Sequence, residues 1–105
     1  MGDYLLLYDG GRMPEGEAEQ KAVMGAWDAW FGSLGDAVKD GGNPFTPSAM
    51  TIASDGSVSD GVGSMASGYS VITADSLDDA VTKAKGCPVL QGGAKISVFE
   101  TFNVM

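Results

Sequence analysis

The sequence predicts an α+β protein in which two helices cover one face of an antiparallel sheet. Residues 68–102 read as a strand, a helix and a strand in succession, with glycine and proline between them. Residues 3–8 and 15–38 read as another strand and a longer helix, and two short strand segments follow within residues 49–60. The predicted order is therefore β-α-β-β-α-β, which is the ferredoxin-like split βαβ plan.

Composition is that of one small globular domain, residues 1–105, with 44% hydrophobic residues and a single core. The net charge is −8 and the 6 basic residues form no cluster, so binding to nucleic acid or to an anionic membrane is disfavoured. No apolar run approaches the roughly 20 residues of a membrane span, and no signal-peptide pattern opens the sequence. A single cysteine suits a reducing compartment, and we expect a cytoplasmic protein.

The first strand and the first helix are predicted from their apolar spacing. Residues 4–8 are apolar throughout, as expected for an inner strand covered on both sides. In the helix of residues 15–38, four large apolar side chains form one stripe and three more widen it: Val23, Trp27, Trp30 and Leu34, then Met24, Phe31 and Val38. Three glycines weaken this helix, and they either permit close packing or mark an early end near Leu34.

The middle of the chain contains several residues that are typical of turns and loops. Residues 40–44 read as a loop that contains two glycines and a proline. The dipeptide Asp55-Gly56 suits a type I′ turn between strands at 49–54 and 58–60. The small, glycine-rich residues 61–67 read as a further loop.

The last third of the chain carries the clearest helix signals. Ser76 is placed to cap the second helix, and Gly86 and Pro88 end it. The apolar stripe of this helix recurs at i, i+3, i+4 and i+7: Leu77, Ala80, Val81 and Ala84. The final strand is predicted at 95–102.

The sheet face turned away from the helices is expected to be apolar. Alternate residues such as Ile52, Tyr69, Val71 and Phe99 fall on that face. A single chain would leave it in water, and an exposed apolar face is a predicted interaction site. We therefore expect a homodimer whose sheets pack face to face.

The chain contains five landmarks: an apolar first strand at 4–8, a Trp-containing helix, the loop at 40–44, the block at 74–80, and Gly86-Cys87-Pro88. Together they resemble the YCII-related family of the dimeric α+β barrel group, over nearly the whole chain. The resemblance implies a ferredoxin-like fold, a homodimer and a poorly defined activity. Related barrels include cofactor-free monooxygenases and muconolactone isomerase-like enzymes, which is an analogy at the level of the fold.

The chain departs from this family at two places. Many relatives carry Asp-Gly-Pro-Phe after the hairpin, where this chain has Asp60-Gly61 followed by Val62 and Gly63. Some relatives have a histidine on the first helix, proposed as catalytic, and the matching position here is Met24. The sequence therefore leaves open whether the protein is an enzyme.

The chain contains no histidine, which removes the commonest general base and the commonest zinc ligand. A Ser-His-Asp mechanism is excluded, and we expect neither a tightly bound transition metal nor a cofactor. Cys87 follows the C-terminal end of a helix, where the helix dipole disfavours a thiolate, so we interpret it as structural.

Asp60 is the first candidate for a catalytic group. It retains the Asp-Gly start of the family motif beside a glycine-rich loop, where a carboxylate can act as a general base. The candidate ligand-binding residues are Asp28, Asp40, Tyr69, Tyr4 and Met24. Aspartates serve turns and surfaces more often than catalysis, and tyrosines commonly pack in strands, so each candidate also has an ordinary structural role open to it.

We expect the chain to bind a small apolar or aromatic metabolite in a pocket between helix and sheet, with carboxylate-based catalysis left open. This function predicts a closed apolar cavity edged by Asp or Tyr. The alternative is a non-catalytic dimeric interaction module that binds a protein partner. That function predicts a filled core and an exposed patch.

Overall fold

The computed structural model describes residues 2–11, 16–46, 48–62 and 66–102. The elements in chain order are β1 (Gly2–Asp9), α1 (Gly16–Leu34), a 3-10 turn (Gly35–Ala37), β2 (Val38–Asp40), β3 (Met50–Ile52), β4 (Val58–Asp60), β5 (Ala66–Ala74), α2 (Leu77–Ala84), a second 3-10 helix (Pro88–Gly92) and β6 (Lys95–Glu100). No helix among these residues is long and apolar enough to cross a membrane.

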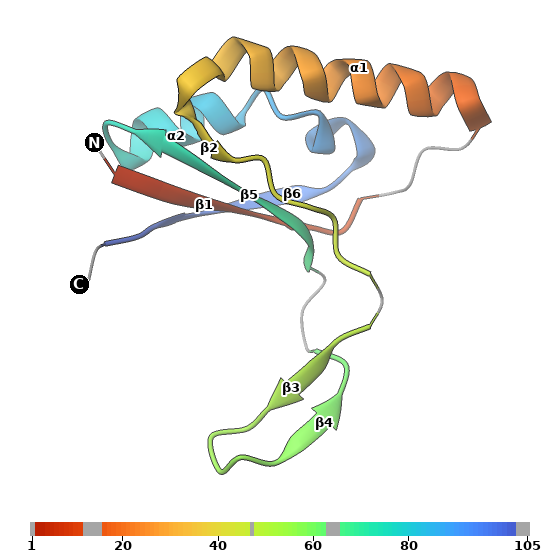
Figure 1. The fold of residues 1–105 in the computed structure, drawn as a ribbon, viewed down its shortest axis with the longest axis vertical. Helices are drawn as coiled ribbons and strands as arrows, with labels where there is room; N and C mark the ends of the chain where they lie inside the picture. The colour runs from red at the N-terminus through yellow and green to blue at the C-terminus, as the bar shows by residue number, and fades with distance from the viewer. Residues whose placement is uncertain (1, 12–15, 47, 63–65, 103–105) are drawn as a thin grey trace.

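A four-stranded antiparallel sheet in the order β2-β5-β1-β6 forms the body of the molecule. Both helices lie on the same face of this sheet, and the β3-β4 hairpin projects away from it (Figure 1). Strand order and directions are those of the ferredoxin-like plan, so the predicted α+β fold class is confirmed.

Strand β1 occupies the centre of the sheet and sets its two faces. Tyr4, Leu6 and Tyr8 are buried on the helix side, whereas Leu5 and Leu7 lie on the opposite face, as strand alternation requires. The buried cluster on the helix side is completed by residues from the other elements: Trp30, Ile72, Ala74, Ala80, Ala84 and Cys87.

Trp30 is the buried residue of α1, and its indole Nε1 donates a hydrogen bond to the carbonyl oxygen of Lys83 in α2, at 3.0 Å. Trp27 packs edge-on against Tyr8, with ring centroids 5.7 Å apart. The predicted stripe is therefore right at its centre. It is wrong for Met24, which is 68% exposed, because the N-terminal half of α1 extends past the sheet (Figure 1).

The prediction of helix up to residue 38 and a loop at 40–44 is wrong in part, because the edge strand β2 lies there. The helix ends at Leu34, where Gly35 adopts a φ of +55°, and Val38 starts a strand instead of continuing the helix. Val38 pairs with Ile72, and Asp40 pairs with Val71, so Asp40 belongs to a strand and not to a loop. Three residues are too few to show strand alternation, which is why the sequence pattern missed this strand.

The β3-β4 hairpin forms where two strands were expected, but it is a separate sheet. Ile52 therefore does not share a face with Tyr69, Val71 and Phe99, and that part of the prediction is wrong. The other three residues do lie together on the face away from the helices, as their pairing with β1 shows.

The turn of this hairpin also differs from the predicted type I′. A type I′ turn needs a positive φ at both central residues, and no described residue other than glycine has one. Gly56 alone, at φ +90°, takes the left-handed conformation, and the amide of Ala53 donates to the carbonyl of Ser57 at 2.7 Å. This is a three-residue loop that ends in a left-handed glycine.

The cap of α2 is confirmed, because the hydroxyl of Ser76 accepts a hydrogen bond from the amide of Asp79 at 3.0 Å. The final strand ends at Glu100, two residues earlier than expected. The loop predicted at residues 61–67 is shorter than expected, because β5 starts at Ala66, and its residues 63–65 lie outside the described residues.

We predict that Gly25→Ala stabilises the protein. Gly25 lies inside α1, and a Cβ there would meet nothing within 4 Å. Replacing glycine with alanine in an open helical position should therefore raise the free energy of unfolding by about 1 kcal/mol, as measured by urea denaturation. The contrasting variant is Gly42→Ala, which should be strongly destabilised because its Cβ would lie 1.7 Å from the carbonyl oxygen of Tyr69. Equal effects in the two variants would contradict this account.

We predict that Trp30→Ala lowers the free energy of unfolding by about 3–5 kcal/mol, as truncation of a buried aromatic residue does. The variant loses both the buried indole and its hydrogen bond to Lys83. Trp27→Ala should cost less, since Trp27 is only partly buried. A loss below about 1 kcal/mol for Trp30→Ala in the same denaturation experiment would mean that α1 does not pack as described.

Candidate functional site

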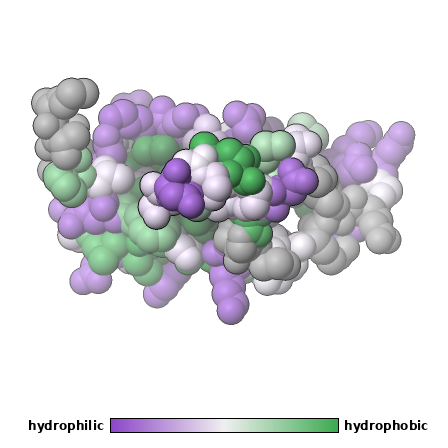
Figure 2. All heavy atoms as spheres, turned by 90° about the horizontal axis from the view of Figure 1, so that it is seen from below, coloured by the Kyte–Doolittle hydropathy of each residue, from purple (hydrophilic) through white to green (hydrophobic). Residues whose placement is uncertain are grey.

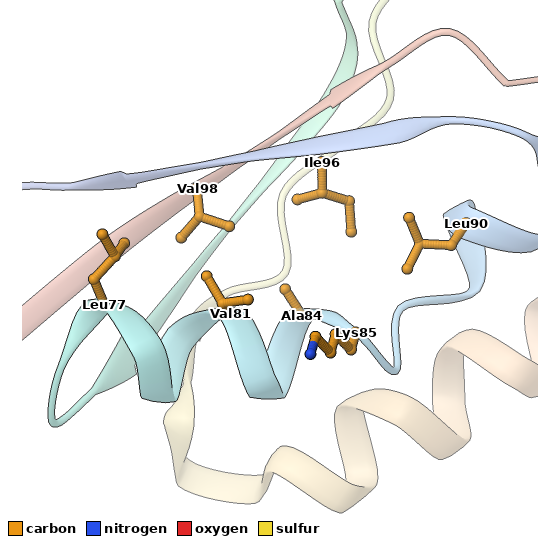
Figure 3. Close-up of a pocket in the computed structure, with 7 residues that line it drawn as sticks. All are labelled: Leu77, Val81, Ala84, Lys85, Leu90, Ile96 and Val98. Atoms are coloured by element: carbon orange, nitrogen blue, oxygen red, sulfur yellow. The ribbon is translucent and has the colours of Figure 1, made fainter.

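An apolar pocket of about 350 Å³ lies between α2 and the edge strand β6. Figure 3 shows Leu77 and Val81 of α2 facing Val98 and Ile96 of β6 across it. The complete lining is Leu77, Val81, Ala84, Lys85, Leu90, Ile96 and Val98. The pocket therefore has an apolar interior and a single charged residue, Lys85.

The pocket follows from the side chains that α2 turns toward the sheet. Ala80 and Ala84 are buried, and their small side chains let this face of the helix approach β1 closely. The larger Leu77 and Val81 lie beside them and are partly in water. Three residues of the stripe predicted as core, Leu77, Val81 and Ala84, thus line the pocket, and the pocket is open instead of closed.

Lys85 directly follows α2, next to the pocket. It makes no ion pair with another residue of the described ranges. An ammonium beside an apolar wall suits a ring compound that carries an anionic or electronegative substituent. No aspartate or tyrosine edges this pocket, which differs from the predicted cavity.

A second pocket of about 320 Å³ lies on another side of α2, next to the end of β5 and the first 3-10 turn, and several charged residues line it. Its charged side chains include Lys83 and Asp79, which form an ion pair at 2.6 Å. The hydrogen bond from Lys83 holds the pKa of the Asp79 carboxyl below its usual value. Within the described part of the chain, no three acidic or cysteine residues come together as metal ligands.

A buried hydrogen-bond chain lies on the helix side of the sheet. The hydroxyl of Tyr8 donates to Ser70 Oγ at 2.6 Å, and Ser70 donates to the carbonyl oxygen of Gly41 at 2.8 Å. Burial raises the pKa of the Tyr8 hydroxyl and of the Cys87 thiol. Both groups therefore stay neutral, which fits a structural role for Cys87 and not a nucleophilic one.

The aspartates singled out from the sequence lie in three different places. Asp60 ends β4 on the projecting hairpin, and Asp28 lies on the outer side of α1, both exposed. Asp40 ends β2, and its carboxylate accepts a hydrogen bond from the amide of Gly42 at 2.9 Å, as a turn residue does.

The remaining candidate residues are also dispersed. Met24 is exposed on α1. Tyr4 is buried in β1 and donates a hydrogen bond to the carboxylate of Glu100 at 3.1 Å, and burial raises its pKa. Tyr69 lies on the open sheet face, stacked on Phe45. None of the six candidates lines the pocket between α2 and β6, and their functional roles stay predictions.

The open face of the sheet is apolar, as expected. Leu5 and Leu7 from β1, Tyr69 and Val71 from β5, and Phe99 from β6 lie on it. Phe99 is among the exposed large hydrophobic residues, and the other four are partly exposed. In the described structure this face is covered by no helix (Figure 1).

No family model matches the chain, and no curated protein matches it. Among solved structures, the chain is similar to 5-chloro-2-hydroxyhydroquinone dehydrochlorinase from Burkholderia phenoliruptrix AC1100, in complex with 2,5-dihydroxybenzoquinone. The TM-score is 0.54 at 20% sequence identity, and the likeness covers 95% of this chain and 93% of that chain. At this identity the likeness establishes the fold alone.

We predict a stability loss in alkali that depends on Tyr8. A raised pKa means that the folded protein favours the neutral form of the Tyr8 hydroxyl. The stability that this gives is fully present below the ordinary pKa of 10.0 and is lost as pH rises through the raised pKa of the folded state. At pH 8, Tyr8→Phe should be less stable than the wild type by about 1 kcal/mol, because it lacks the hydrogen bond to Ser70. In denaturant unfolding experiments, the difference in stability between the two proteins should become smaller above pH 10. A difference that stays constant up to pH 11 would contradict the prediction.

Proposed function

We propose that the chain binds a small apolar or aromatic metabolite in the pocket between α2 and β6. The observation that supports this function is the pocket itself, at about 350 Å³, with apolar walls and Lys85 at one side. Sites for small molecules are typically concave, largely apolar and fitted with few polar groups. Lys85 would then contact an anionic or electronegative substituent of the ring.

The structural neighbour supports the chemical class without naming the ligand. Its structure holds 2,5-dihydroxybenzoquinone, a small ring compound with oxygen substituents. An apolar pocket with one ammonium suits that class. We use this quinone and benzoate as probes for that reason.

We predict that these probes raise the thermal unfolding midpoint of the wild-type protein, since a ligand stabilises the state that binds it. Val81→Trp should abolish the shift by filling the pocket. The matched control is Thr82→Trp, which places the same side chain on the exposed side of α2 and should keep the shift. Loss of the shift in both variants, or in neither, would contradict the assignment.

The contribution of Lys85 needs a separate test, because its ammonium would contact the anionic substituent of the ligand and not the ring. Lys85→Met should weaken benzoate binding by about two- to five-fold, the range of a solvent-exposed ion pair. Lys21→Met, which removes a charge on the distant exposed side of α1, should leave the affinity unchanged.

Carboxylate-based catalysis through Asp60 is a further proposal, separate from the pocket, because Asp60 lies on the projecting hairpin and does not line the pocket. Lys85 is the only ionisable side chain among the lining residues, so the pocket favours binding over carboxylate chemistry. Asp60→Asn keeps the side-chain shape and removes the charge. If a screened compound is turned over and this variant leaves the rate unchanged, Asp60 has no catalytic role and serves only as a residue of strand β4.

We also propose membership in the YCII-related family, as one cytoplasmic domain that forms a homodimer. The sequence landmarks and the ferredoxin-like fold support the family, and the apolar sheet face supports the dimer. Sedimentation at micromolar concentration should give twice the chain mass of 10.7 kDa. A folded monomer at these concentrations would contradict the dimer.

A further inference from the structure

We propose that the β3-β4 hairpin, residues 48–62 and here called the arm, packs on a second copy of this chain. The inference rests on the homodimer of the proposed function and adds a specific contact to it. The arm projects from the body (Figure 1), and in the described structure its two strands pack mainly against each other.

One face of the arm is apolar and uncovered. Ile52 pairs directly with Val58, and Met50 pairs with Asp60, so these four side chains lie on the same face. Ile52, Met50 and Val58 are 71%, 67% and 59% exposed. The opposite face carries the polar pair Thr51 and Ser59, and Figure 2, which views the molecule from the arm's side, shows hydrophobic side chains at the surface of the arm.

Such a hairpin is not expected to persist alone in water. It has three residue pairs, whereas an isolated two-stranded hairpin is marginal even when longer. The side-chain contacts that stabilise it are polar. The amide of Ser57 donates a hydrogen bond to the carboxylate of Asp55 at the tip, and the hydroxyl of Thr51 donates one to the carbonyl oxygen of Gly61. Burial of the apolar face against another surface would supply the stabilisation that these contacts lack.

The root of the arm lies on the open sheet face. The ring of Phe45 stacks on Tyr69 with centroids 6.0 Å apart and planes inclined by 27°. The amide of Phe45 donates to the carbonyl of Ser67 at 2.8 Å, and Pro44 bridges to Gly68. The apolar sheet face therefore continues through Phe45 toward the arm.

This continuity favours a second copy as the occupant. A two-fold dimer is self-complementary, so one association covers the sheet face and the arm of both chains. The sheet face also presents an ammonium that could meet the carboxylate of Asp60 on the arm: Lys95 lies there, opposite Asp9 of β1, and makes no ion pair among the described residues.

The test compares dimer dissociation constants by sedimentation equilibrium of the full chain. The double variant Ile52→Asp/Val58→Asp should raise the constant at least tenfold. The matched control Thr51→Asp/Ser59→Asp adds the same charge on the polar face and should stay within twofold of the wild type. The uncharged variant Ile52→Ser/Val58→Ser should also weaken the dimer. All four substituted positions are exposed, and circular dichroism checks that each variant keeps the fold.

The possible results distinguish a failure of the arm contact from a failure of the homodimer itself. A folded wild-type protein that stays monomeric at micromolar concentration overturns both the homodimer and the arm contact. A wild-type dimer whose dissociation constant is unchanged in both arm-face variants overturns the arm contact alone. Equal weakening by the apolar-face and polar-face aspartate variants also overturns it, because the effect then comes from charge and not from the apolar face.

Discussion

The indole of Trp30 joins the two helices and holds both on one face of the sheet. It belongs to the buried cluster that also contains the β1 side chains, and its Nε1 donates a hydrogen bond to the backbone carbonyl of Lys83 in α2. Gly86 permits this approach, since a Cβ there would lie 3.1 Å from the indole. Because both helices are committed to one face, the apolar residues of the other face remain open.

The same packing creates the pocket. The alanines of α2 bring the helix close to β1, and the larger side chains beside them then overhang β6 without filling the space. The edge strand supplies the second wall through Ile96 and Val98. A short helix with small residues toward the centre and larger ones toward the edge thus produces both a core and a concave apolar surface.

Long-range architecture was predictable where local signals were strong. The cap at Ser76, the stripe around Trp30 and the alternation of β5 carry their own patterns. Strand β2 did not, because three residues that follow a left-handed Gly35 show no period. The sequence favours the β3-β4 hairpin for this place in the sheet, because its turn signal is strong, but pairing with the sheet depends on tertiary contacts that local patterns do not carry.

The candidate site was less predictable than the fold. Motif reasoning favours isolated carboxylates such as Asp60, which the fold places on the exposed arm. The pocket instead uses Leu77 and Val81, residues whose helical spacing is the same as that of a core stripe. Only the tertiary position of α2 over an edge strand distinguishes a pocket wall from a core, and the charge of Lys85 gave no signal because lysines are common on helix ends.

The most direct measurement of the central claim is a methyl NMR titration with 2,5-dihydroxybenzoquinone. It distinguishes the pocket from the open sheet face, the two apolar surfaces of the body. The account predicts saturable shifts at the methyl groups of Val81, Ile96 and Val98, with the methyl groups of Leu5 and Val71 on the sheet face unaffected. Shifts confined to the sheet face, or no saturable shift, would contradict it.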